Sequence, residues 1–343
     1  MKITNRLMAV SALLLCTETV VHAQGRVTLY GILDSNVEVT NAGNGTTARM
    51  DSGSLLGSRF GMQGVEDIGG GNHVNFALEQ GYLLNNGAAA TQGLAFSRQA
   101  WIGLSGDWGE VRIGRQNSPL YIPLSSRFDA FLVGTVATAL GNLQSITARV
   151  SNAIYYSTPT LSGLSAQFMV GLRDSTTKPT NGVANYHVVV TYKNGPLDVG
   201  AGYQEANNDI GTSTLRVLFA GGNYKFGKLT VYGVYNRGQQ TDGTVKTDVF
   251  TTSALYEFTP SSFVSIGCGY AHDLTGAGNN ARQVGAMYRY LLSKRTLIYT
   301  SAAFLQNRNN ATYRLTGGTQ IGIPAAFPGA DARGIELGMQ HLF

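Results

Sequence analysis

The sequence predicts an all-β protein, specifically a 16-stranded antiparallel transmembrane β-barrel whose third long loop folds inward. Three observations lead to this fold class. The chain of 343 residues contains 44 glycines, 17 tyrosines and 14 phenylalanines, which favours many turns and many aromatic strands. Many short segments alternate apolar and polar residues with a period of two. Short turns and long polar stretches alternate between these segments, as in barrels of the outer membrane.

The first element is a predicted secretory signal peptide over residues 1–23. Two basic residues precede an apolar stretch, and Val21-His22-Ala23 provides small or apolar side chains around a cleavage site. Leu15 precedes Cys16 where a lipoprotein signal requires a small side chain, which favours ordinary cleavage. We therefore expect export and a mature chain of residues 24–343 that forms one barrel domain.

The composition of the mature chain excludes several classes of function. Cys268 is its single thiol, so it can form no intrachain disulfide and no cysteine metal cluster. The five histidines have no zinc-site spacing, and we expect no metal and no cofactor. The formal net charge, +5 for the whole chain and +4 without Lys2, Arg6 and Glu18 of the signal peptide, comes without a run of basic residues, which argues against nucleic-acid binding. No mature segment is long and apolar enough for a transmembrane helix, so a membrane form must be a closed barrel.

The strands are predicted by alternation. In the segment from Leu197 to Gln204, apolar side chains at odd positions alternate with Asp, Gly and Gln at even positions. The same period recurs over 164–173, 264–270 and 284–290. Sixteen such runs follow one another from Arg26 to Phe343. A barrel of about that size is too wide for its side chains to fill and leaves an aqueous channel.

One connection departs from this pattern. Residues 119–152 separate two strands by a long loop that contains the apolar pieces Phe131–Val133 and Val136–Leu140. A loop so long and so apolar should pack against other protein, and the barrel interior is the nearest available surface. We therefore predict that it is a constriction loop folded into the pore.

Several segments resemble the general porins of β-proteobacteria, within the Gram-negative porin family. The most specific begins with Ser58-Arg59-Phe60-Gly61 and ends with Gly69-Gly70-Gly71. The others, in chain order, are Tyr30–Asp34, Phe76–Glu79, Arg98–Leu104, Gly114–Gln116, Asn152–Tyr156 and Gly338–Phe343. The resemblance covers the mature chain in order, and it implies a homotrimer of 16-stranded barrels, each with its own pore narrowed by the third outer loop.

The resemblance also implies an arginine ladder on the wall that faces carboxylates on the constriction loop, with a transverse field between them. Arg59, Arg98 and Arg115 match the ladder by position. Alternation supports Arg59, because Phe60 and Met62 should point outward, and it supports Arg98, because Trp101 should point outward. Arg115 reaches the pore only if a bulge intervenes at Gly114. Glu79, predicted to face inward, matches a pore carboxylate of some relatives.

Two departures from the family pattern weaken this ladder. Tyr156 stands where several members carry a further pore arginine, and Asp129 is the loop's single acid, beside Arg127 and Arg149. We therefore expect only a weak preference for anions. The residues assigned to the constriction are Arg59, Glu79, Arg98, Arg115, Arg127, Asp129 and Tyr156.

The last strand alternates outward apolar residues with inward polar ones and ends at Phe343. A terminal phenylalanine in this position resembles the signal read by the barrel-insertion machinery, and the alternative is an ordinary aromatic residue at the membrane interface. The other expected partners are outer-membrane lipid, lipopolysaccharide, and small hydrophilic solutes and ions.

These observations predict a porin of the outer membrane that allows passive diffusion of small hydrophilic solutes, and not an enzyme. A solute-specific channel remains the near alternative, with the apolar loop and Tyr156 forming a binding site. A barrel enzyme and a secreted β-domain or adhesin are more distant alternatives. No Gly-x-Ser-x-Gly nucleophile motif supports an enzyme.

Overall fold

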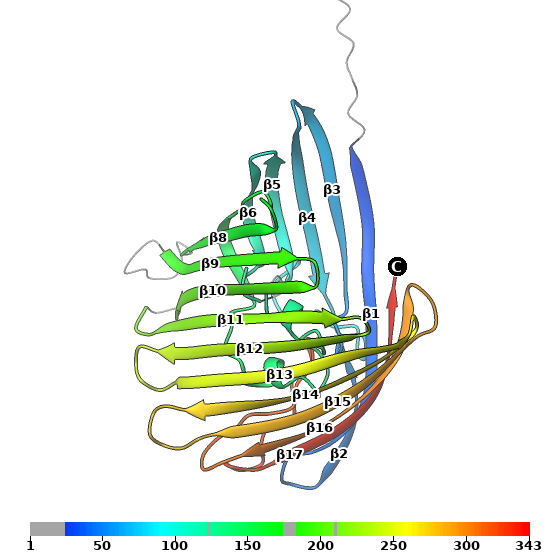
Figure 1. Cartoon of the computed structure of the whole chain (residues 1–343), viewed down its shortest axis with the longest axis vertical. Coiled ribbons are helices and arrows are strands. Elements are labelled where there is room, and N and C mark those ends of the chain that lie inside the picture. Colours follow the sequence, from blue (N-terminus) through cyan, green and yellow to red (C-terminus); the bar gives the residue numbers. More distant parts are fainter. Residues whose placement is uncertain (1–24, 122–123, 174–182, 209–210) are drawn as a thin grey trace, which may run out of the picture.

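The computed structural model describes residues 25–121, 124–173, 183–208 and 211–343 (Figure 1). The predicted signal peptide lies outside the described residues. Within them, one antiparallel sheet closes on itself, with all pairings between neighbouring segments. Its strand segments are β1 (Arg26–Asn41), β2 (Thr46–Ser52), β3 (Arg59–Gly69), β4 (Asn72–Gly81), β5 (Gln99–Gly106), β6 (Gly109–Asn117), β7 (Arg149–Ser157), β8 (Leu164–Leu172), β9 (Val183–Asn194), β10 (Leu197–Asn207), β11 (Thr214–Phe226), β12 (Leu229–Gln240), β13 (Lys246–Thr259), β14 (Ser262–Asp273), β15 (Ala281–Leu291), β16 (Thr296–Asn307) and β17 (Ala332–Leu342).

The barrel closes where β1 pairs with β17, from Ile32 opposite Leu342 to Asn41 opposite Arg333. On its other edge β1 pairs with both β2 and β3 in succession. These two segments therefore form one barrel strand that is interrupted at residues 53–58, and the 17 segments make 16 strands. The predicted 16-stranded antiparallel barrel is confirmed.

One predicted loop is wrong in its extent. Residues 42–53 are one of the long polar stretches from which the sequence predicts outer loops, but Thr46–Ser52 continues the sheet as β2 after a turn of four residues. Its residues pair with β1 from Ser35 opposite Ser52 to Asn41 opposite Thr46. Polar composition indicated a loop here, although a strand at the rim of a barrel can also be polar on both faces.

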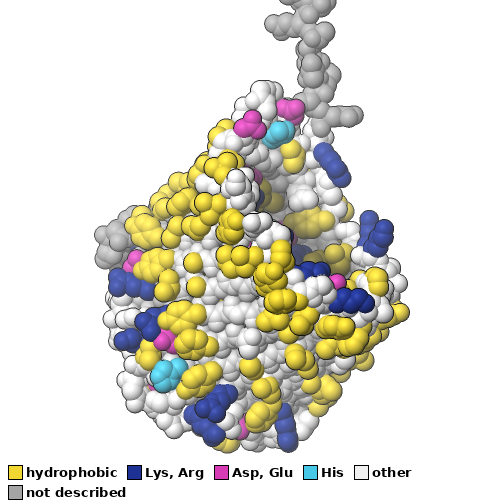
Figure 2. Space-filling model, viewed as in Figure 1, with side chains coloured by type: hydrophobic (Ala, Val, Ile, Leu, Met, Phe, Trp, Pro, Cys, Tyr) yellow, Lys and Arg dark blue, Asp and Glu magenta, His cyan; other side chains and the backbone are white. Residues whose placement is uncertain are grey.

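Alternation along the strands separates an apolar outer face from a more polar inner face. Val284, Phe304 and Ile335 are outward residues on three neighbouring strands and are 55%, 44% and 55% exposed. Their inward neighbours Gln283 and Glu336 are buried. Figure 2 shows hydrophobic side chains spread over the strand surface, as expected for a wall that faces hydrocarbon.

The long loop between β6 and β7 lies against the inner wall. It contains a short 3-10 helix, η1 (Ser125–Phe128), and a short α-helix, α1 (Ala139–Leu143), whose N-cap Thr138 accepts a hydrogen bond from the Gly141 N–H. Leu120, Leu124, Phe128 and Leu140 of the loop pack with inward residues of the wall. Those wall residues are Val189, Val217, Phe219 and Val234.

Inward glycines on the wall leave room for this loop. A Cβ atom added at Gly285 would lie 2.2 Å from the carbonyl oxygen of Ala137. One added at Gly269 would lie 2.7 Å from the Cβ atom of Ala139, which also belongs to the loop. Gly200 and Gly267 likewise lie next to Leu124 and Phe131 of the loop. Part of the high glycine content is therefore explained by the seating of the loop and not by turns.

Candidate functional site

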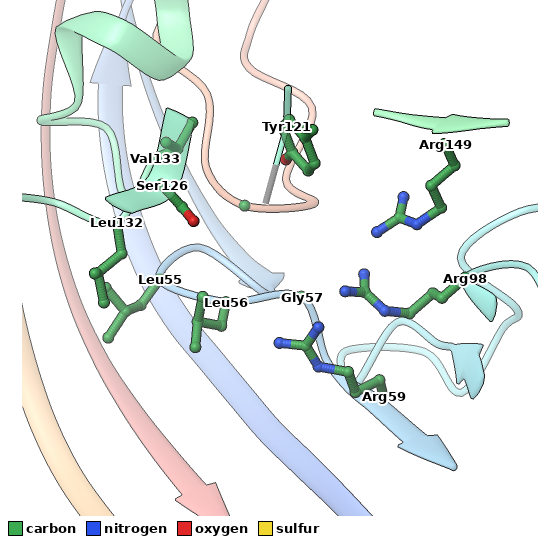
Figure 3. Close-up of a pocket in the computed structure, with 11 residues that line it drawn as sticks. Leu55, Leu56, Gly57, Arg59, Arg98, Tyr121, Ser126, Leu132, Val133 and Arg149 are labelled. Carbon is green, nitrogen blue, oxygen red and sulfur yellow. The ribbon is translucent and has the colours of Figure 1, made fainter. Parts of the chain in front are cut away.

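A cavity of about 320 Å³ lies inside the barrel between the wall and the long loop (Figure 3). Three arginines occupy one side of it, Arg59, Arg98 and Arg149. Figure 3 shows their guanidinium groups pointing into the same space. The residues on the remaining sides are Leu55, Leu56, Gly57, Tyr121, Ser126, Leu132, Val133 and Gly318. Within the described part of the chain, no carboxylate lines this cavity.

Each arginine is placed by the point at which a wall strand begins. Arg59 is the first residue of β3, and the exposure of Phe60 and Met62 puts its side chain on the inner face. Arg98 directly precedes β5, where its backbone N–H bonds to the Glu79 carbonyl at 3.1 Å. Arg149 is the first residue of β7 and ends the long loop. Three chain segments that are distant in sequence thus bring three cations together.

Glu79 is the carboxylate nearest to these arginines, and it is already paired. The Arg98 Nε atom donates to Glu79 Oε1 at 2.7 Å, and the Tyr30 hydroxyl donates to Oε2 at 3.0 Å. The Arg98 and Glu79 side chains are only 5% and 4% exposed, so the pair is shielded from bulk solvent. Three positive charges and one negative charge leave the site with a net charge of about +2.

The opposite side of the cavity is formed by a strained segment of the loop. Leu132, Val133 and Thr135 have φ values of 60°, 58° and 67°. Positive φ is unfavourable for β-branched residues, so the surrounding structure must hold this segment in place. The Thr135 N–H bonds to the Ser54 carbonyl at 2.7 Å. The cavity is therefore bounded by a fixed loop conformation and not by a free surface loop.

Asp129 helps to hold this segment, and the structure places it away from the cavity. Its Oδ2 atom accepts hydrogen bonds from the Val133 N–H at 2.9 Å and the Thr138 hydroxyl at 2.7 Å. Ser253 on the wall donates to Oδ1 at 3.4 Å. The side chain is buried, and burial raises the pKa of the Asp129 carboxyl. The predicted role of Asp129 as an acid facing the arginines is not the one this geometry supports.

Arg127 and Arg115 also lie outside the cavity lining. The Arg127 Nε atom is 2.5 Å from Asp198 Oδ2 on β10, so its charge is neutralised at the wall. The β6–β7 pairing does shift register between Gly114 and Gln116. Even so, the Arg115 guanidinium bonds to the Ser97 carbonyl at 2.8 Å and to the Ser151 hydroxyl at 2.7 Å.

Two residues lie on the opposite face of the wall from the one predicted. Tyr156 shares the outer face with Ile154, and its hydroxyl donates to the Trp108 carbonyl at 2.8 Å. Trp101 was predicted to point outward, but its neighbour Ile102 is the outward residue and is 58% exposed. Trp101 therefore lies on the inner face, where the Arg112 Cζ atom is 4.3 Å from its ring centroid. Arg98 nevertheless points inward, because it precedes the strand and is not bound by its alternation.

Arg149 and Tyr121 are cavity residues that the sequence did not single out. Arg149 was noted only as a neighbour of the loop acid, and Tyr121 not at all. Alternation gave no signal for Arg149, because Val150 and Ala153 are both buried although their positions differ in parity, so the period of two is broken at the start of β7. Tyr121 carried no signal either, because irregular loops have no period.

Phe343 closes the sheet at the short-turn end. Its N–H and carbonyl exchange hydrogen bonds with Gly31, both at 3.1 Å. A Cβ atom at Gly31 would lie 2.2 Å from the Phe343 ring, so the ring covers this glycine. The terminal residue is therefore part of the seam between β1 and β17.

The described residues contain no metal-binding cluster and no disulfide. They contain no group of three or more His, Cys, Asp or Glu side chains placed to hold a metal ion. Cys268 is exposed on the outer face and forms no disulfide. In the same part of the chain, no helix has the length and apolar character needed to cross a membrane.

Comparisons with known proteins agree with this geometry. The profile of the Gram-negative porin family matches residues 9–310. The chain is 30% identical to outer membrane porin protein 32 of Delftia acidovorans, over 94% of this chain and 95% of that protein. It is also 30% identical to a major outer membrane protein P.IB of Neisseria meningitidis, over 83% and 89% of the two chains.

Solved structures show the same fold. An anion-selective porin from Comamonas acidovorans superposes with a TM-score of 0.81 at 26% identity, over 93% of this chain and all of that one. Vibrio cholerae OmpT, solved in a trimer form, has a TM-score of 0.70 at 16% identity over 93% and 99% of the chains. The chain therefore belongs to the Gram-negative porins, which form channels across the bacterial outer membrane.

Proposed function

We propose that this porin favours anions and that the cavity beside the long loop is the constriction of its pore. The observation that carries the proposal is the set of three arginines that line the cavity, with no carboxylate among the described lining residues. The anion selectivity named for the Comamonas acidovorans structure supports the same reading. An anion in the cavity would meet a net positive wall on one side and apolar loop residues on the other.

The residues proposed for the constriction change in the light of the structure. Arg59, Arg98 and Arg149 supply the positive wall, and Glu79 moderates it through its pair with Arg98. Residues 119–152 supply the opposite wall, with Asp129 as an internal support of the loop. We expect no enzymatic activity from this arrangement.

The test is the reversal potential of the purified channel in planar bilayers across a potassium chloride gradient. An anion-sided potential supports the proposal, and a cation-sided one contradicts it. The same recordings test the oligomeric state, because the conductance of a homotrimer should fall in three equal steps as its three pores close. The trimer form of the Vibrio cholerae relative supports that expectation.

A second candidate function is a channel specific for small organic anions. Leu55, Leu56, Leu132 and Val133 give the cavity an apolar side opposite the arginines. An organic anion with a carboxylate and a short apolar chain would contact both. Conductance that is blocked by such an anion at a saturating concentration would favour this candidate over general diffusion.

Two proposals concern the ends of the chain. We propose that the mature protein begins near Gln24, which intact mass measurement of the exported protein would test. Phe343, which lies at the β1–β17 seam, is proposed as the signal for the barrel-insertion machinery. Phe343→Ala should lower the amount of assembled barrel in the membrane, while Phe258→Ala, an outward aromatic far from the seam, should not.

A further inference from the structure

A second cavity lies against the inner wall of the barrel, near the end that carries the short turns. It has a volume of about 440 Å³, and its lining comes from β1, β3, β4, β5 and β6, which are neighbours in the sheet (Figure 1). Two arginines contribute to this lining, Arg26 at the start of β1 and Arg112 on β6. We call this space the turn-side cavity. The other lining side chains that bear on its chemistry are Thr28, Gln63, Asn75, Trp101 and Glu110.

The register of the sheet places both arginines in one row across the wall. The row runs from β6 to β1 through Arg112, Gly103, Asn75, Val65 and Arg26, each directly opposite the next. Val65 is the seventh residue of β3, so the row lies about 20 Å closer to the short turns than the arginine that begins this strand. The turn-side cavity and the cavity beside the long loop share no described lining residue. A solute that crosses the barrel therefore meets them one after the other.

The Arg112 guanidinium is held in a fixed position on the wall. Its Cζ atom lies 4.3 Å from the Trp101 ring centroid and 5.2 Å from that of Tyr155, at distances typical of cation–π contacts. Its Nη2 atom donates to Glu110 Oε2 at 2.6 Å. A Cβ atom added at Gly103 would lie 3.1 Å from Arg112 Cγ, so the glycine leaves room for the side chain. The cavity thus has one cation whose position is set before any solute arrives.

Three further polar side chains of the turn-side cavity have no partner among the described residues. Val27 and Leu29 are both 64% exposed on the outer face, so alternation turns Arg26 and Thr28 inward. The side chains of Arg26, Thr28 and Gln63 make no hydrogen bond or ion pair with any described residue. Within the described structure, these groups can therefore be satisfied only by water or by a solute.

The chemistry of the lining defines the kind of solute that fits. Two arginines and one carboxylate, Glu110, give the cavity a net charge of about +1, which matches a monoanion. The Gln63 amide and the Thr28 hydroxyl can each donate and accept hydrogen bonds, as the hydroxyl groups of a sugar do. The Trp101 N–H already donates to Gln99 Oε1 at 3.0 Å, so the indole offers ring surface for C–H groups.

We propose that the turn-side cavity binds polyhydroxylated monocarboxylates, the class of the sugar acids. Arg26 and Arg112 hold the carboxylate. Gln63 and Thr28 bond to hydroxyl groups, while Trp101 packs against the carbon skeleton. A neutral sugar leaves the arginines without an anion, and a short fatty acid leaves the amide and hydroxyl groups unused. The proposal rests on the proposed function only in requiring an open pore, and it adds a second site and a substrate class.

The test is block of the potassium chloride current through the purified channel in planar bilayers, with potassium glucuronate as the probe. The concentration for half block should be about tenfold lower for glucuronate than for glucose or potassium propionate, because each of these lacks one set of contacts. Glucuronate is added to one side and then to the other, with the voltage reversed so that the anion is driven inward each time. Block should be stronger from one side, since only one mouth leads to the turn-side cavity without passing the cavity beside the long loop.

The variant that tests the assigned contacts is Arg26→Gln/Gln63→Ala. Neither side chain has a partner among the described residues, so the substitutions leave no group in the wall unsatisfied. Loss of one charged and one neutral hydrogen-bonding group should raise the half-block concentration of glucuronate about thirtyfold. The matched control is Arg295→Gln/Gln306→Ala, which removes the same groups from a short turn and from the outer face of β16. The control should be blocked like the unaltered protein.

Three results would overturn the proposal. They are equal half-block concentrations for the variant and the control, equal block by glucuronate and propionate, and equal block from the two sides. Conductance in potassium chloride alone is measured on every protein first, and a normal value shows that a change in block does not come from misfolding. The reversal potential is recorded on the same channels. A cation-sided value would contradict the proposed anion preference while glucuronate block still reports on the turn-side cavity.

Discussion

Removing Arg149 should reduce anion preference more cleanly than removing Arg98, which is paired with Glu79. Arg149 lines the cavity and has no ion pair with a carboxylate among the described residues, unlike Arg98. Arg149→Gln keeps a polar side chain of similar length while it deletes one positive charge. The substitution therefore changes the field in the cavity without leaving a buried acid unpaired.

The size of the effect follows from the dimensions of the cavity. A sphere of about 320 Å³ open to the centres of water molecules has a radius of roughly 4 Å, and the radii of water and of the lining atoms add about 3 Å. An ion at its centre therefore lies roughly 7 Å from the guanidinium groups on its wall. One unit charge at that distance in water contributes ~0.6 kcal/mol, and screening at 0.1 M salt halves this to ~0.3 kcal/mol. Because an anion loses this energy and a cation gains it, the anion-to-cation permeability ratio should fall about threefold.

The assay is the reversal potential in a tenfold gradient of potassium chloride around ~0.1 M, repeated near 1 M, where the screening length is only ~3 Å. The Arg149→Gln potential should move toward zero at low salt and differ little from the unaltered protein at high salt. Arg282→Gln removes the same charge from the outer face and should leave the potential unchanged. If Arg149→Gln leaves it unchanged at low salt, the cavity is not the selective part of the pore.

Three further predictions follow from the same contacts. Glu79→Gln deletes the acid paired with Arg98 and should raise the anion-to-cation ratio in the same assay, by less than about threefold because Glu79 lies outside the cavity lining, whereas a fall would mean that Arg98 depends on Glu79 for its position. Gly285→Ala should push Ala137 off the wall, at a cost of about 1–3 kcal/mol, and change single-channel conductance, while Gly233→Ala, with no atom within 4 Å of its Cβ position, should not. Asp129→Ala leaves three donors unsatisfied and should lower the thermal midpoint of unfolding more than Asp129→Asn does. Because burial raises the pKa of Asp129, the folded form binds its proton more tightly, so the midpoint should fall as pH rises above ~4, and Asp129→Asn should abolish that slope.

The sequence was sufficient to predict the barrel and the inward orientation of Arg59. A period of two assigns every residue of a strand to one face of the sheet once the faces of a few side chains are known. The exposure of Phe60 and Met62 agrees with that assignment. The same rule misplaced Trp101, because one wrong starting face reverses a whole strand. Tyr156 was assigned to the pore by the family resemblance and not by alternation. Tyr155, and not Tyr156, is the buried neighbour on β7.

The constriction was harder to predict because loops have no period. The sequence indicated that residues 119–152 pack against protein, but which of their side chains line a cavity depends on contacts with the wall. Asp129 illustrates the difficulty, since a lone acid in a pore loop suggests a charged lining, and the structure uses it to cap backbone and hydroxyl donors. Arg149 was missed because it belongs to the loop by sequence and to the wall by position.

The seam of the barrel links assembly to the width of the pore. Glu336 lies on β17, the strand that closes the barrel, and its carboxylate accepts hydrogen bonds from the Val136 N–H of the loop at 3.2 Å and from the Ser54 hydroxyl at 2.6 Å. Ser54 in turn accepts the Thr135 N–H. The anchor for the loop is therefore completed only when the last strand meets the first. A nascent barrel should acquire its narrow opening in the same step that seals it, so the cell need not pass through a stage with a sealed, wide and unselective hole in its envelope.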